Sequence, residues 1–133
     1  MLGWFKRKPP PAPEPLRGAP EVRRLKTHQA ETGYVYQYYF DGWRPVDDGH
    51  EFVFAASSDR SRYWPVPVLL EEAGVRAWEQ ERGRELISAE RHAVAKLALL
   101  AAFDERPPAA LTATPIRVDG RQLSEILTHL GRD

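Results

Sequence analysis

The sequence predicts an α+β fold, in which a three-stranded antiparallel sheet packs on a long helix and is followed by a further strand and a C-terminal helix. The first observation is the length of 133 residues, which suits one domain and a tail. The second is alternation of aromatic and β-branched residues in the first half, which is typical of strands. The third is apolar residues at helical spacing in the second half. The resulting order, β-β-β-α-β-α, indicates one layer of sheet and one layer of helices.

The three expected strands cover residues 34–40, 51–57 and 62–70. Residues 21–31 precede them and are polar, which favours a short helix or a linker. Period-two alternation in the first strand gathers four rings on one face, and we interpret this face as core under the long helix: Tyr34, Tyr36, Tyr38 and Phe40. Tyr39 lies on the opposite face and is the candidate for an exposed aromatic contact.

Glycine and proline predict where these strands turn or lie at an edge. Asp41-Gly42 and the segment 47–49 are turn signals. Pro65 and Pro67 remove backbone donors from one side of the third strand, so we expect that side to face an open edge.

Helix formers dominate from residue 71 onward, and the boundaries follow from breakers and caps. Gly83 is expected to interrupt the first stretch, and Ser88 to cap the long helix, which should end before Pro107. Residues 111–118 are expected to be extended. The last helix should begin at a capping box formed by Asp119 and Gln122.

Proline and charge divide the chain into an arm, residues 1–20, and a single α+β domain, residues 21–133. Six of the twelve prolines lie in the first 20 residues, which predicts a disordered, extended arm. Residues 1–26 carry a net charge of +5, whereas residues 27–133 carry 12 basic and 17 acidic side chains, a net charge of −5. A basic arm therefore precedes an acidic body, and the arm favours anionic partners.

The tip of the arm combines apolar and basic residues suited to an anionic membrane surface: Trp4, Phe5, Lys6, Arg7 and Lys8. The alternative is a terminus that binds nothing or folds back on the body. No apolar run approaches the roughly 20 residues that span a bilayer. We expect a cytoplasmic protein, with peripheral binding at the inner membrane face as an option.

The sequence favours no catalytic residue, cofactor or metal site. It has no cysteine, which excludes disulfides and thiolate ligands. The acidic cluster at residues 47–51 lacks the spacing of a calcium loop and is typical of a hairpin turn. Ser88 and His92 lie one helical turn apart, but no acid that would orient His92 is evident.

Three functions follow, in order of preference. The first is a small non-enzymatic interaction or adaptor module that binds a protein partner and carries a flexible basic tether. The second is nucleic-acid binding through the arm and the arginines of the sheet turns. The third is an enzyme of unidentified class. The candidate residues for contact with a partner or nucleic acid are Tyr39, Arg44, Arg60 and Arg62.

Overall fold

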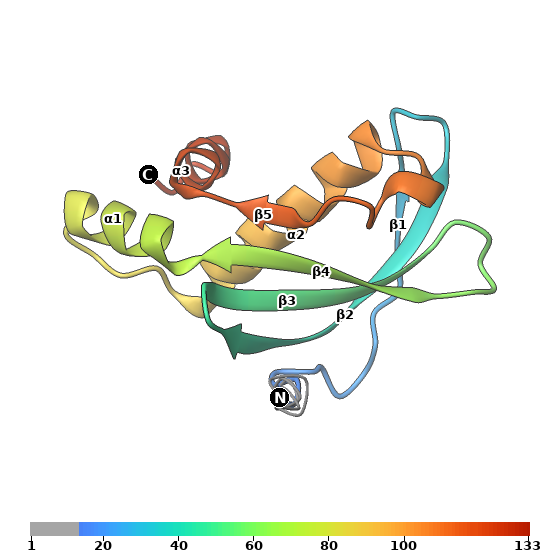
Figure 1. The fold of residues 1–133 in the computed structure, drawn as a ribbon, viewed down its shortest axis with the longest axis horizontal. Coiled ribbons are helices and arrows are strands. Elements are labelled where there is room, and N and C mark those ends of the chain that lie inside the picture. Colours follow the sequence, from blue (N-terminus) through green and yellow to red (C-terminus); the bar gives the residue numbers. More distant parts are fainter. Residues whose placement is uncertain (1–13) are drawn as a thin grey trace, which may run out of the picture.

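The computed structural model describes residues 14–133 and has an α+β fold, as predicted, built on a curled, mixed sheet of five strands (Figure 1). The strands are β1 (Lys26–Gln29), β2 (Val35–Val46), β3 (Gly49–Ser57), β4 (Trp64–Glu71) and β5 (Ile116–Val118). The helices are α1 (Glu72–Arg82), α2 (Ser88–Glu105) and α3 (Gly120–His129), with a short 3-10 turn, η2 (Pro108–Ala110). Strands β1 to β4 are antiparallel neighbours in chain order, and β5 pairs parallel to β4. In Figure 1, α2 crosses behind the sheet.

The sheet has five strands where the sequence predicted three, because β1 and β5 add one strand at each edge. β1 forms within the polar segment that favoured a helix or linker, because its residues pair with Val35–Tyr38 of β2. It is an edge strand whose side chains are mostly exposed, so it lacks the apolar alternation that reveals a strand. β5 covers only the end of the expected segment 111–118, and it joins the sheet beside β4.

Gly42 extends β2 instead of ending it, which corrects the turn expected at Asp41-Gly42. The register of β2 against β3 shifts between Phe40 and Gly42, which is the sign of a β-bulge. Gly42 has a φ of 137°, a value that residues other than glycine rarely adopt. The turn predicted at residues 47–49 is found at Asp47-Asp48, and Gly49 is the first residue of β3.

Pro65 and Pro67 lie in the half of β4 that has one neighbouring strand. They face Ala55 and Val53 of β3, whereas β5 pairs only with Val68–Leu70. The predicted open edge is therefore correct for this half of β4. It is wrong for the other half, because β5 covers it.

The tyrosine face of β2 is core, as predicted, at Tyr36 and Tyr38. The Tyr36 ring is fully buried and stacks on Phe103 of α2, with ring centroids 4.1 Å apart and planes 9° apart. Tyr34 lies at the start of the strand, beyond the cover of the helix, and is 46% exposed. The face therefore packs on α2 from Tyr36 onward.

Most of the expected helix boundaries are confirmed. Gly83 ends α1 in a left-handed conformation, and α2 ends at Glu105, just before Pro107. The Asp119–Gln122 capping box opens α3, with hydrogen bonds of 2.9 and 3.1 Å. Ser88 is not the cap of α2. The helix begins at Ser88, its N-cap residue is Ile87, and the Glu90 carboxylate in the first turn accepts a hydrogen bond from the backbone N–H of Ile87.

Residues 14–20, which the sequence assigned to a solvated arm, contact the bulge of β2. Arg17 and Trp43 exchange two backbone hydrogen bonds of 2.7 and 2.9 Å. The segment reaches this position because Gly42 has no side chain: a Cβ there would lie 2.8 Å from the carbonyl oxygen of Arg17. The tip residues Trp4, Phe5, Lys6, Arg7 and Lys8 lie outside the described residues. Within residues 14–133, no helix is long and apolar enough to cross a membrane.

Candidate functional site

Two adjoining hollows lie between the N-terminal segment, β2 and α2. The first, here called the Trp43 hollow, has a volume of about 440 Å³, and its lining includes Trp43, His50, Phe52, Ser88 and Arg91. The second, the lysine hollow, has a volume of about 550 Å³, and its lining includes Arg24, Lys26, Tyr38, Tyr39 and Lys96. Both are also lined by Gly18, Phe40 and His92. These shared residues join the two hollows into one groove.

Helical spacing sets the direction of the groove along α2. Ser88, His92 and Lys96 are four residues apart, so they lie on one face of the helix. Ser88 lines the Trp43 hollow, His92 lines both hollows, and Lys96 lines the lysine hollow. The groove therefore follows the helix axis from the start of α2 toward its middle.

The bulge in β2 places the opposite wall. Phe40 and Trp43 are three positions apart and would point to opposite faces of a regular strand. The extra residue at the bulge restores the inward orientation, so Phe40 pairs with Phe54 and Trp43 with Phe52, both buried residues of β3. Phe40 and Trp43 thus line the same groove.

Residues 17 and 18 fix the rim of the groove against Trp43. The Arg17 guanidinium lies over the Trp43 ring, 5.3 Å from its centroid. A Cβ on Gly18 would lie 3.2 Å from that ring, so the backbone itself packs on the indole. The rim is therefore bound by two backbone hydrogen bonds and an aromatic contact.

His92 lines both hollows and packs among aromatic rings. Its imidazole meets Phe40 edge-on at 4.5 Å between centroids, and it lies 6.1 Å from Phe54. Burial lowers the pKa of His92, and the positive charges of Lys96 and Lys26 lower it further. The groove therefore favours the uncharged form of this ring.

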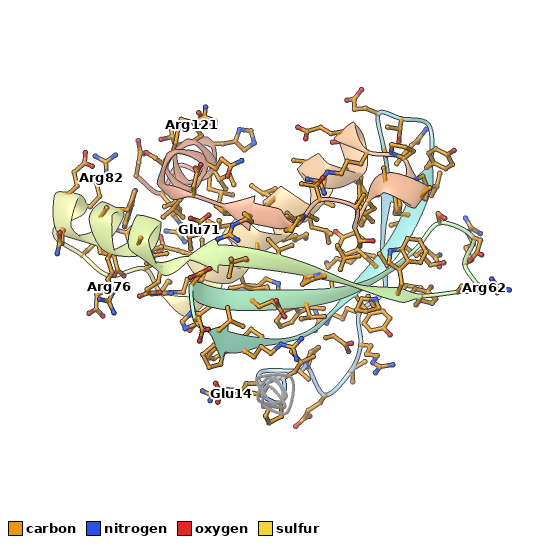
Figure 2. The ribbon with its side chains drawn as sticks, viewed as in Figure 1. Glu14, Arg62, Glu71, Arg76, Arg82 and Arg121 are labelled. Atoms are coloured by element: carbon orange, nitrogen blue, oxygen red, sulfur yellow. The ribbon has the colours of Figure 1, made fainter. Side chains whose placement is uncertain are left out.

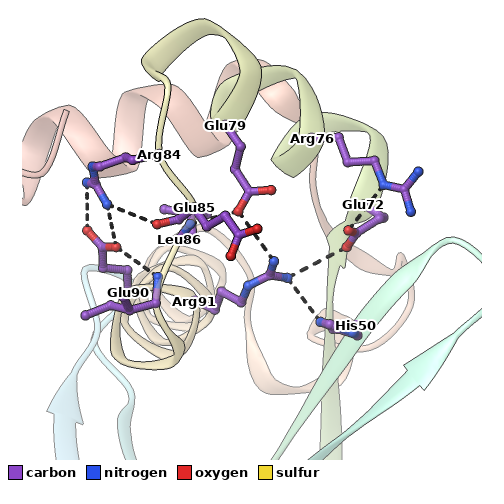
Figure 3. Close-up of polar contacts among 10 residues, drawn as sticks. His50, Glu72, Arg76, Glu79, Arg84, Glu85, Leu86, Glu90 and Arg91 are labelled. Atoms are coloured by element: carbon purple, nitrogen blue, oxygen red, sulfur yellow. Dashed lines mark hydrogen bonds and ion pairs between the residues drawn. The ribbon is translucent and has the colours of Figure 1, made fainter.

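Arg91 contributes a guanidinium to the Trp43 hollow, but carboxylates compensate its charge (Figure 3). It lies 3.7 Å from Glu72 and 3.8 Å from Glu79. It also donates to His50 Nδ1 at 3.2 Å, because a guanidinium has no acceptor. Burial and then Arg91 lower the pKa of His50. The Trp43 hollow is consequently aromatic, with its one cation paired.

The lysine hollow differs because its cations have no acidic partner. Within residues 14–133, no carboxylate forms an ion pair with Arg24, Lys26 or Lys96, and neither hollow is lined by an Asp or Glu. Burial lowers the pKa of Lys96, and Lys26 lowers it further. One end of the groove is thus positive in a body whose net charge is negative.

The structure separates the four contact residues predicted from sequence. Tyr39 lines the lysine hollow, half-buried, with the Arg23 guanidinium 4.8 Å from its ring centroid. Arg44 forms an ion pair with Glu51 at 2.9 Å. Arg60 and Arg62 lie in the exposed turn between β3 and β4, and Figure 2 places Arg62 at the tip of that turn, far from Glu14.

Sequence reasoning missed most of the groove. Trp43 was not identified because its inward orientation depends on the bulge, and a strict two-residue alternation of side chains does not predict a bulge. Lys26 lies in the unrecognised strand β1. The four-residue spacing of Ser88, His92 and Lys96 was the available signal, since it places all three side chains on one helix face.

The structure does not bring together the side chains considered from sequence for catalysis or for metal binding. Ser88 and His92 both line it, but among the described residues no hydrogen bond joins them. The side chains of the cluster at residues 47–51 diverge, because Asp48 meets Arg117, His50 meets Arg91 and Glu51 meets Arg44. Residues 14–133 contain no group of three His, Asp or Glu side chains placed to hold a metal ion.

Comparison with protein-family models, with curated proteins and with solved structures finds no match to this chain.

Proposed function

We propose that this protein is a non-enzymatic interaction module that binds an acidic, partly apolar segment of a partner protein in the groove. The observation that carries the proposal is the polarity of the groove, which is aromatic at Trp43 and positive at Lys26 and Lys96. An unpaired positive end favours an anionic partner even though residues 27–133 carry a net charge of −5.

The size and shape of the groove support a peptide segment as the occupant. Hollows of about 440 and 550 Å³ lie within the usual range of roughly 300–1,000 Å³ for ligand sites. Because they adjoin along α2, one extended segment can place an apolar side chain beside Trp43 and an acidic group beside Lys96. Aromatic anchors with a charged neighbour are typical of residues that dominate binding energy.

Selection from a random peptide library on the full chain tests this function. We expect enrichment of peptides that combine acidic residues with Leu, Phe or Trp. The affinity of a selected peptide, measured by calorimetry, should fall about tenfold in Lys96→Met, which removes one charge-assisted contact. The control is Arg121→Met, an exposed arginine of α3 that pairs with Glu125 and lines neither hollow, which should bind normally. Failure to enrich any peptide, or equal binding by Lys96→Met, would contradict the proposal.

Nucleic-acid binding is the second candidate, and one observation favours it: Tyr39 and Phe40 line the lysine hollow beside unpaired cations. Rings beside cations are also typical of single-strand binding. A labelled single-stranded oligonucleotide should then bind the full chain with a steep loss of affinity as salt is raised. Absence of binding at low salt would end this candidate.

A further inference from the structure

We infer that the lysine hollow binds a phosphate monoester on the partner's segment, so that the module distinguishes a phosphorylated segment from an unmodified one. This inference rests on the proposed function and adds the chemical identity of the anion. It depends on the contrast between the two ends of the groove.

The number of unpaired cations favours a doubly charged anion. Arg24, Lys26 and Lys96 line the same hollow, and within residues 14–133 none of them forms an ion pair. A carboxylate supplies one negative charge, whereas a phosphate monoester carries about −1.5 to −2 at pH 7 and three acceptor oxygens. Arg91 at the other end already has Glu72 and Glu79, so it competes little for the anion.

The two lysines bring like charges to one hollow from different elements of the fold. Lys96 projects from α2 and Lys26 from β1, and both line the hollow from different sides. Lys96 is partly withdrawn from water, and its pKa is lowered by burial and by Lys26. Lys26 is exposed, so the repulsion acts on the partly buried Lys96, and an anion bound beside both lysines would reduce it.

The walls of the hollow set what surrounds the phosphate. Tyr38, Tyr39 and Phe40 supply rings, and His92 lines both this hollow and the Trp43 hollow. The neighbouring residue of the segment would then place an apolar side chain beside Trp43. Recognition of phosphate by a cationic cluster next to an apolar pocket is an established mode of reading modified peptides.

A small probe tests the anion separately from the peptide. Phenyl phosphate and benzoate share a ring and differ in the anionic group, so each is titrated into the ¹⁵N-labelled full chain and followed by NMR. We expect the amide signals of residues 24, 26 and 96 to shift, with phenyl phosphate binding about tenfold more tightly than benzoate. Equal binding of the two probes, or shifts confined to residues outside the lysine hollow, would overturn the inference.

Two variants test whether the lysines cause the preference for phenyl phosphate over benzoate. Lys26→Met and Lys96→Met keep the aliphatic stem and remove one of the three charges, so each should lower the preference for phosphate. The control Arg121→Met should retain it. If either variant fails to fold, as judged by circular dichroism, the comparison of the two probes on the natural chain decides. Retention of the full preference in both folded variants contradicts the inference.

Matched peptides separate this inference from the proposed function. Three versions of one selected peptide carry phosphoserine, glutamate or serine at the acidic position. We expect the phosphoserine peptide to bind about tenfold more tightly than the glutamate peptide. Equal affinity overturns the inference and leaves the function standing. Tighter binding of adenosine monophosphate than of the phosphopeptide would overturn the peptide as the source of the phosphate.

Discussion

Gly74 of α1 and Gly120 of α3 touch backbone to backbone: a Cβ on Gly74 would lie 2.7 Å from the Cα of Gly120. Gly74→Ala should therefore push the two helices apart and lower the free energy of unfolding by about 1–3 kcal/mol, measured by urea denaturation. The matched control is Gly120→Ala, because a Cβ there would lie 3.4 Å from the Cα of Gly74, an ordinary contact. Equal stability of the two variants would show that the helices do not depend on this contact.

Glu90 should make the free energy of unfolding depend on pH in the acidic range. It is 4% exposed, and hydrogen bonds from Arg84 and the N–H of Ile87 hold its pKa at about 2, below the ordinary 4.5 (Figure 3). A lowered carboxyl pKa stabilises the fold above pH 4.5, and this contribution is lost as the pH falls from 4.5 toward 2. Glu90→Gln should flatten this part of the pH profile of urea unfolding. It should also cost on the order of 2 kcal/mol at pH 7.

His92 and His50 should make the free energy of unfolding depend on pH in a higher range than Glu90 does. Burial lowers the pKa of both below 6.5, so the unfolded chain binds more protons than the folded chain as the pH falls through 6.5. The free energy of unfolding should therefore decrease between pH 7 and pH 5. His92→Phe should reduce that decrease, since it removes one titrating group from the aromatic cluster. An unchanged slope in this variant would contradict the prediction.

Gly42 should allow residues 17 and 18, which form the rim of the groove, to pair with β2. In Gly42→Ala, the new Cβ would meet the carbonyl oxygen of Arg17 at 2.8 Å, so we expect the Arg17–Trp43 bridge to open. The Trp43 amide, which donates to Arg17, should then exchange with deuterium faster. Gly33→Ala is the control, because Gly33 also has a positive φ, 93°, but its Cβ would meet nothing within 4 Å. Faster exchange at Trp43 in both variants would assign the effect to backbone strain.

The tip of the arm stays a proposal, and deletion tests it. If Trp4, Phe5, Lys6, Arg7 and Lys8 contact anionic lipid, the full chain should co-sediment with phosphatidylserine vesicles. A chain that lacks residues 1–8 should not. Since each basic residue near such a surface contributes about 1 kcal/mol, 0.5 M salt should release the full chain. Equal sedimentation of both chains would end the proposal.

The sequence predicted those elements whose structure depends on residues close together in the chain. The alternation of β2, the break at Gly83 and the capping box at Asp119 depend on residues close in sequence, and all three were predicted. β1 and β5 were not placed in the sheet, because their partners lie elsewhere in the chain and their own side chains give little alternation. The groove was missed for a related reason. Trp43 joins it only through a bulge, and Arg24, Lys26 and Lys96 come together only in the folded chain.

The Arg17–Trp43 bridge has a practical consequence for anyone who purifies this protein. Glu14, the first described residue, is held by its carbonyl oxygen to Arg44 at 3.4 Å, only a few residues before Gly18 at the mouth of both hollows. An affinity tag fused directly before Glu14 would therefore start close to the proposed binding groove. A tag placed after Asp133, beyond α3, leaves that mouth clear and is the better handle for immobilisation.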